Sequence, residues 1–183
     1  HSFPTRRSSD LIIIDGNLYY GKSGFSGEFG HFCMFENEVL CHCGKKGCLE
    51  TEASGSAFHR ILIERYREGS NTILAGKLDS GEEISLGDLL EAVRKEDVLC
   101  IDILEKMGVN LGKGIAGLMN IFNPELVILG GTLSLAGEYI SLPIKSAIRK
   151  YSLNLVNQDT EIKISKLGER AGAFGACLLS RSK

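Results

Sequence analysis

The order of helical and strand patterns along residues 96–180 limits the possible folds more than any other feature of this sequence. An apolar stripe at 3–4–3–4 spacing predicts a long helix over about 96–122. The members of this stripe are Ile101, Leu104, Leu111, Ile115, Leu118 and Phe122. A short apolar run at 125–129 comes next and predicts a strand that is buried on both faces. The pattern then continues as helix, strand and helix over residues 138–152, 161–165 and 169–180. This alternation predicts an α/β layer with a largely parallel sheet.

Three glycines interrupt the long helical pattern, at Gly108, Gly112 and Gly117. Each of them weakens a helix by roughly 1 kcal/mol relative to alanine. We therefore expect this helix to pack closely against a neighbour at the three positions.

Upstream of residue 96 the sequence predicts a hairpin and two further helices. Residues 11–20 read as strand, turn and strand, with the turn near Asp15-Gly16 or Gly16-Asn17. A helix capped by Thr51 or Ser54 is expected to end near residue 68. Ser85 with Asp88 three positions later resembles a capping box and predicts a second helix.

The composition excludes several classes of protein. The chain of 183 residues is 43% hydrophobic and 24% charged, with a net charge of −2, so it is neither a disordered polymer nor a strongly basic nucleic-acid binder. Its longest apolar runs are too short to cross a bilayer, and we expect no signal peptide. We expect a cytoplasmic protein with no membrane partner, whose DNA contacts, if any, come from outside this chain.

One histidine and three cysteines within a short segment form a candidate metal site: His31, Cys41, Cys43 and Cys48. Three thiolates and one imidazole complete the tetrahedral coordination of zinc, and a site closed in this way is structural rather than catalytic. Gly44 and Gly47 allow the backbone to turn tightly enough to direct the three sulfurs to one point. The sequence therefore predicts a zinc loop at about residues 31–50.

Other interpretations of the cysteines stay open at this point. Cys33 and His42 are competing donors within the same segment. The alternative to a metal site is a set of reduced surface thiols, although exposed thiols at such density are a liability. Cys100 and Cys177 stand apart in apolar helical patterns, so we expect both to be small buried side chains.

The first ten residues differ in character from the rest of the chain. Residues 1–10 (HSFPTRRSSD) are polar and basic and begin with histidine, and an apolar strand pattern starts abruptly at residue 11. We interpret them as a non-native junction segment, and the alternative is a genuine flexible arm. In either case residues 11–183 are expected to be the C-terminal part of a longer protein.

Four segments taken together carry a resemblance to a known family. They are residues 27–31 (GEFGH) with 41–50 (CHCGKKGCLE), residues 123–134 (NPELVILGGTLS) and residues 172–176 (GAFGA). These segments resemble the ROK family of bacterial sugar kinases and sugar-responsive repressors. The resemblance covers nearly all of residues 11–180. It implies the C-terminal lobe of an actin-like ATPase (ribonuclease H-like) α/β fold, with a small zinc-binding loop.

The resemblance also implies ligand-binding residues. Glu28, His31 and Glu50 match the family's ligands for sugar hydroxyls, with His31 placing one ring nitrogen on zinc and the other toward the sugar. Carboxylates and a fixed imidazole make the directional hydrogen bonds that a polyol needs, whereas the alternative for Glu28 and Glu50 is ordinary surface charge. Gly130 and Gly131 match the family's adenosine motif, and the alternative there is a simple turn with positive φ.

The sequence also departs from the family's kinases. These enzymes need an Asp-x-Gly-Gly phosphate loop, a catalytic aspartate and a second phosphate loop rich in glycine and threonine. None of the three is present in this sequence. Phosphoryl transfer without them lacks both positioning and charge stabilisation. We therefore expect no catalytic residue in this chain and no kinase activity from it alone.

Two functions compete for the parent protein. The resemblance of residues 41–56, 80–88 and 130–132 favours a transcriptional repressor that responds to a monosaccharide and binds promoter DNA through an N-terminal domain outside this chain. The alternative is a glucokinase-like, ATP-dependent hexose kinase that uses ATP with magnesium. A third interpretation is a zinc-stabilised oligomerisation domain. The family further implies a homodimer or tetramer.

Overall fold

A computed structural model describes residues 11–181, and the expected junction segment at residues 1–10 lies outside the described residues. The chain divides into two compact units, residues 1–51 and residues 52–183. We describe each unit by itself.

The first unit consists mostly of turns. Strands β1 (Ile13–Ile14) and β2 (Asn17–Leu18) form an antiparallel hairpin. Its turn residues, Asp15 and Gly16, have φ values of 51° and 76°, as in the turns whose twist matches that of a hairpin. The predicted hairpin is confirmed, with a ladder of two residues in each strand. The unit continues through the 3₁₀ helix η1 (Phe29–His31), and α1 (Glu50–Ala53) begins at its end.

Side-chain caps mark the starts of three helices in the second unit. These helices are α2 (Gly55–Arg67), α4 (Leu86–Arg94) and α5 (Val98–Phe122). Ser54 caps α2, Asp97 caps α5, and Ser85 caps α4 in a reciprocal capping box with Asp88. The predicted starts at Ser54 and Ser85 are thus confirmed. Helix α3 (Ala75–Ser80) was not predicted from the sequence, because it has only six residues and no side-chain cap.

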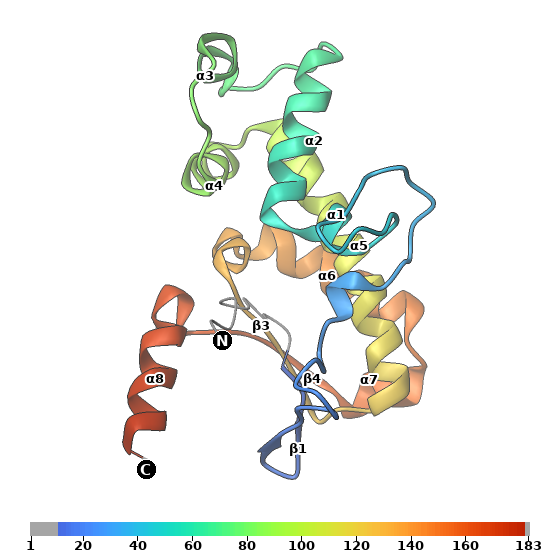
Figure 1. The fold of residues 1–183 in the computed structure, drawn as a ribbon. Coiled ribbons are helices and arrows are strands. Elements are labelled where there is room, and N and C mark those ends of the chain that lie inside the picture. The colour runs from blue at the N-terminus through green and yellow to red at the C-terminus, as the bar shows by residue number, and fades with distance from the viewer. Residues whose placement is uncertain (1–10, 182–183) are drawn as a thin grey trace. The chain divides into compact units, whose positions relative to one another are not determined.

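Helix α6 (Glu138–Tyr151) packs along α5 at two glycines (Figure 1). A Cβ on Gly108 would lie 2.9 Å from Cβ of Pro143, and a Cβ on Gly112 would lie 2.6 Å from the carbonyl oxygen of Ile144. The expected close packing is confirmed at these two positions. It is wrong for Gly117, where a Cβ would meet nothing within 4 Å.

The core of the second unit covers a wider face of α5 than the predicted stripe. Leu104 and Ile115 are buried as expected, whereas Phe122 at the end of the stripe is 47% exposed. The reason is that α2, α4 and α6 all pack against α5, so residues outside the stripe are also buried. These include Leu99, Cys100, Ile103, Met107 and Met119. Burial of Cys100 was predicted correctly, but the prediction for Cys177 is wrong because Cys177 is exposed.

The predicted parallel sheet is confirmed as a pair of strands. Strand β3 (Leu126–Leu129) pairs in parallel with β4 (Glu161–Ile164), after a crossover that contains α6 and α7 (Asn154–Asp159). The expectation that both faces of the first strand are buried is wrong, since Ile128 is 62% exposed. Among the described residues β3 has one strand neighbour, and only its face with Val127 and Leu129 meets the core.

The second unit ends in short turns and a final helix. The 3₁₀ helix η2 (Thr132–Ala136) comes after β3, and η3 (Gly168–Arg170) leads into α8 (Ala171–Arg181).

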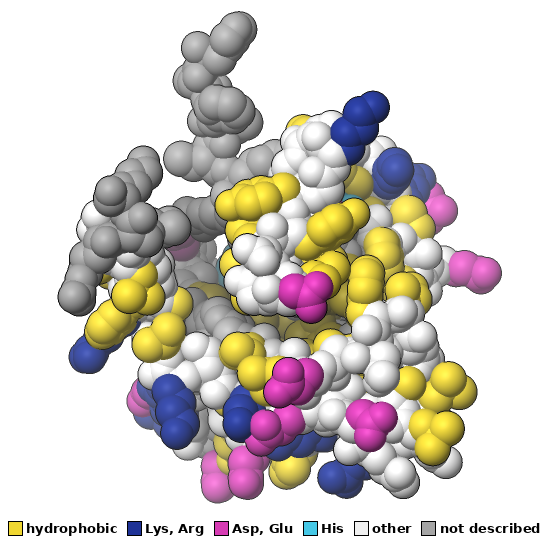
Figure 2. All heavy atoms as spheres, turned by 90° about the horizontal axis from the view of Figure 1, so that it is seen from below, with side chains coloured by type: hydrophobic (Ala, Val, Ile, Leu, Met, Phe, Trp, Pro, Cys, Tyr) yellow, Lys and Arg dark blue, Asp and Glu magenta, His cyan; other side chains and the backbone are white. Residues whose placement is uncertain are grey.

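Figure 2 shows exposed hydrophobic side chains in several places, with acidic and basic side chains mixed among them. None of the helices in residues 11–181 is long and apolar enough to cross a membrane.

Candidate functional site

Tight turns shape the loop that contains the candidate metal ligands. The N–H of Cys41 donates to the carbonyl of Lys45 at 2.8 Å, and the N–H of Gly44 donates to the carbonyl of Cys41 at 2.9 Å. Gly44 and Gly47 have φ values of 84° and 75°, as the predicted turns require. Gly47 is also restricted by space, because a Cβ there would lie 2.2 Å from the carbonyl oxygen of Phe35.

Backbone bonds join this loop to η1. The N–H of Leu49 donates to the carbonyl of Phe32 at 2.9 Å, and the backbones of Cys33 and Cys48 form an isolated antiparallel β-bridge. The thiol of Cys48 lies 3.7 Å from the carbonyl oxygen of His31. These contacts bring the end of the loop next to the histidine that lies seventeen residues earlier.

The four predicted metal ligands lie together in the structure. One ligand atom from each of His31, Cys41, Cys43 and Cys48 falls within 4.8 Å of the others. The Sγ atoms of Cys43 and Cys48 are 3.6 Å apart, and Sγ of Cys41 is 3.5 Å from Nδ1 of His31. A tetrahedral zinc ion with Zn–S bonds of about 2.3 Å places neighbouring ligand atoms roughly 3.8 Å apart. The donor set therefore fits one zinc ion. The competing donors Cys33 and His42 are exposed and are not part of this group of four.

The thiols of this cluster differ in their acidity. Burial, together with the neighbouring thiols of Cys43 and Cys41, raises the pKa of Cys48 to about 12. A hydrogen bond from the backbone of Lys45 lowers the pKa of Cys43. A divalent cation among the sulfurs would offset most of the negative charge of three thiolates, so metal binding would be coupled to the release of protons.

The carboxylates of Glu28 and Glu50 both face the ring of His31. Oε2 of Glu28 is 3.7 Å from Nε2, and Oε2 of Glu50 is 3.9 Å from Nδ1. Glu28 precedes η1 and Glu50 begins α1, so these two turns bring the three side chains together. All three are partly exposed, at 33% to 40%, which leaves their polar atoms accessible to a ligand. Nδ1 also faces Cys41, whereas Nε2 faces Glu28, so one nitrogen can bind metal and the other a hydroxyl group.

Gly130 and Gly131 lie in the second unit, between β3 and η2. Gly131 has a φ of 81°, and its carbonyl accepts hydrogen bonds from the N–H and the hydroxyl of Ser134. This geometry is what the turn interpretation requires. Contact of these glycines with adenine stays a prediction.

Comparisons with known proteins point to one family. The model of the ROK family matches residues 11–183. A glucokinase of Halalkalibacterium halodurans is 35% identical over 165 residues, which are 90% of this chain and 50% of that protein. A xylose repressor of Caldicellulosiruptor bescii is 33% identical over 168 residues, which are 90% of this chain and 41% of that protein. The chain spans about half the length of the curated relatives that it matches.

A solved structure shows the same fold. The crystal structure of a ROK family glucokinase from Streptomyces griseus, in complex with glucose and AMPPNP, matches this chain with a TM-score of 0.81 at 30% identity. The match covers 94% of this chain and 57% of that one.

Proposed function

This chain belongs to the ROK family and has the α/β, actin-like ATPase fold of that family, and we propose that residues 11–183 are its C-terminal lobe and carry most of a monosaccharide site. Glu28, His31 and Glu50 are the sugar ligands of this proposal. The observation that carries it is their convergence, since both carboxylates lie within 3.9 Å of the His31 ring although Glu50 is distant in sequence.

The chemistry of the three side chains suits a polyol. Two carboxylates accept hydrogen bonds from hydroxyl groups, and an imidazole nitrogen donates or accepts according to its tautomer. Because the three side chains are partly buried, their hydrogen bonds to a ligand are less weakened by water than those of fully exposed groups. Small-molecule sites combine a few such polar groups in fixed positions.

We assign zinc to His31, Cys41, Cys43 and Cys48, and the spacing of their ligand atoms supports this assignment. A zinc ion in a closed site of this type supplies folding free energy and takes no part in catalysis. The chain's own contribution to sugar binding is the orientation of His31. With Nδ1 committed to the metal cluster, Nε2 stays directed toward Glu28.

The parent protein of this proposal is a sugar-responsive transcriptional repressor. Similarity to the xylose repressor and the resemblance of residues 41–56 to the repressor branch support this choice. Sugar binding then only needs to shift an equilibrium between two conformations, for which a differential affinity of a few kcal/mol suffices. Promoter DNA would be bound by a domain outside this chain, in a homodimer or tetramer.

The second candidate is an ATP-dependent hexose kinase, and the similarity to two glucokinases favours it. In that case ATP with magnesium is the co-substrate, and the turn at Gly130 and Gly131 approaches the nucleotide. The catalytic base and the phosphate loops would come from the other lobe.

The full-length parent protein distinguishes the two candidates when ATP turnover and release from promoter DNA are both measured with and without sugar. We expect release without turnover. A Cys41→Ser variant should still bind DNA but no longer respond to sugar, and Cys33→Ser serves as the matched control outside the cluster of four. Robust sugar-dependent turnover would contradict the repressor and support the kinase.

A further inference from the structure

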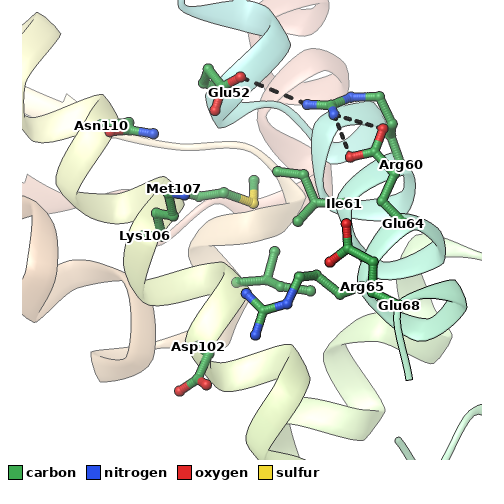
Figure 3. A pocket seen from close by; sticks show the side chains of 11 residues that line it. Glu52, Arg60, Ile61, Glu64, Arg65, Glu68, Asp102, Lys106, Met107 and Asn110 are labelled. Carbon is green, nitrogen blue, oxygen red and sulfur yellow. Dashed lines mark hydrogen bonds and ion pairs between the residues drawn. The ribbon is translucent and has the colours of Figure 1, made fainter. Parts of the chain in front are cut away.

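A cavity of about 220 Å³ lies between α2 and α5 in the second unit (Figure 3). A water molecule needs only about 15 Å³ of such space, so the cavity admits a small organic molecule. It shares no residue with the cluster of Glu28, His31 and Glu50. Its floor is apolar and is formed by Ile61, Ile103 and Met107.

One end of the cavity holds an amide with no hydrogen-bond partner. Asn110 is only 7% exposed and lines the cavity, and Figure 3 shows its amide turned toward the space between the two helices. Within residues 11–181, no group forms a hydrogen bond with this amide, although every side-chain nitrogen or oxygen that is sealed from solvent has a partner. The amide is therefore open to a molecule in the cavity, and a ligand that pairs with it recovers the cost of its partial burial. The sequence signal for this residue is that it is the one polar side chain in residues 107–112 of α5.

The mouth of the cavity carries side chains of both charges, namely three cations and four carboxylates. Arg60 is engaged by Glu64 at 2.7 Å and by Glu52 at 3.8 Å. Two cations and two carboxylates are left without an ion-pair partner among the described residues, and they are Arg65, Lys106, Glu68 and Asp102. This arrangement offers both hydrogen-bond donors and hydrogen-bond acceptors to a ligand.

We propose that this cavity binds a neutral, polyhydroxylated small molecule. The amide of Asn110 donates to and accepts from hydroxyl groups at its end of the cavity, and the charged side chains at the mouth bind the outer hydroxyl groups. The apolar floor contacts the C–H face of the ligand. The site is independent of the proposed sugar site and does not require it.

The test uses the full-length protein with ¹³C-labelled methionine methyl groups and the neutral probes myo-inositol and D-xylose. Met107 lines the cavity, whereas the buried Met119 does not and is the internal control. We expect a saturable shift of the Met107 signal alone, weakened about tenfold in Asn110→Leu, which loses a hydrogen bond to the ligand. A Glu50→Gln change should leave this shift intact, which separates the cavity from the proposed sugar site.

A second pair of variants covers the case in which Asn110→Leu does not fold. Asp102→Asn alters the mouth of the cavity and should weaken binding, while Glu105→Gln makes the same change of charge on the same helix outside the cavity and should not. The proposal is wrong if neither probe shifts Met107. It is equally wrong if the shift is unchanged in both Asn110→Leu and Asp102→Asn.

Discussion

The two units of this chain differ in what stabilises the fold of each one. Among residues 11–51 the buried residues are few, namely Cys41, Gly47, Cys48, Leu49 and Thr51. In the second unit a continuous apolar core extends from Phe58 to Ile148 and joins α2, α4, α5 and α6. A segment with so little apolar surface to bury cannot offset the loss of conformational entropy by packing alone. We therefore expect the loop with the proposed sugar ligands to depend on the proposed zinc ion, and the helical unit not to depend on it.

Removal of zinc should have the largest effect and should be confined to one unit. Structural zinc contributes roughly 10–16 kcal/mol in zinc-finger peptides, so a chelator should strongly increase hydrogen exchange across residues 31–50. Amides of α5 and α6 should keep their protection. Elemental analysis should find one zinc per chain before chelation. Equal loss of protection in both units would contradict this difference between them, and so would a protein that contains no zinc.

Close packing of α5 against α6 should make Gly112 the most sensitive glycine of the second unit. A Gly112→Ala change places a methyl group 2.6 Å from the carbonyl oxygen of Ile144, and overpacking of this kind costs about 2–3 kcal/mol. Gly117→Ala is the matched control, because a Cβ there meets nothing within 4 Å. The control should stabilise the helix by about 1 kcal/mol. Denaturant unfolding of both variants measures this difference, and equal stabilities would contradict the described packing.

The carboxylate of Asp97 should contribute less to the free energy of unfolding than the packing of Gly112 against α6, but more than any ion pair on the surface. Its carboxylate accepts hydrogen bonds from the N–H groups of Cys100 at 2.8 Å and Ile73 at 2.7 Å. Asp97→Ala removes the cap of α5 and leaves these donors unpaired, so we expect a loss of about 2 kcal/mol in the free energy of unfolding. Burial raises the pKa of Asp97, but these hydrogen bonds outweigh it and hold the pKa below 3.8. Chemical denaturation of the variant measures the loss, and wild-type stability would show that the cap contributes nothing.

The smallest effect concerns Asp88 and acidic pH. The ammonium of Lys77 at 2.7 Å, together with the hydroxyl and N–H of Ser85, lowers the pKa of Asp88 from 3.8 to about 2. Because the folded pKa is the lower one, this stabilisation is complete above pH 4 and disappears as the pH falls toward 2. In Asp88→Asn the free energy of unfolding should therefore depend slightly less on pH between pH 4 and pH 2. An unchanged curve in this variant would show that the pair is fully screened by solvent.

The second unit was largely predictable from the sequence because its signals are local. Caps at Ser54 and Ser85, the hydrophobic period and the two close-packed glycines depend on neighbours along the chain or on one adjacent helix. The exposure of Phe122 and Ile128 was not predictable, since it depends on which elements surround them.

The candidate sites also differ in how far the sequence alone could predict them. Candidate metal ligands are recognisable by residue type and spacing, so the sequence could predict that His31 and the three cysteines lie together, while their binding of zinc stays a prediction. The convergence of Glu28 and Glu50 on His31 was expected only through the family resemblance, because charge alone does not distinguish a ligand from a solvated surface residue. Asn110 was missed because its importance comes from near-complete burial without a hydrogen-bond partner, which only a structure reveals.

The proposed binding of a sugar by the two carboxylates beside His31 can be tested by calorimetric titration of the full-length protein with D-glucose and D-xylose. Glu28→Gln and Glu50→Gln should each weaken binding of the preferred sugar about tenfold or more, since each removes a charged hydrogen-bond acceptor. Glu36→Gln removes an exposed carboxylate of the same unit and should leave the Kd unchanged. Wild-type affinity in both Glu28→Gln and Glu50→Gln would contradict the assignment of the sugar site.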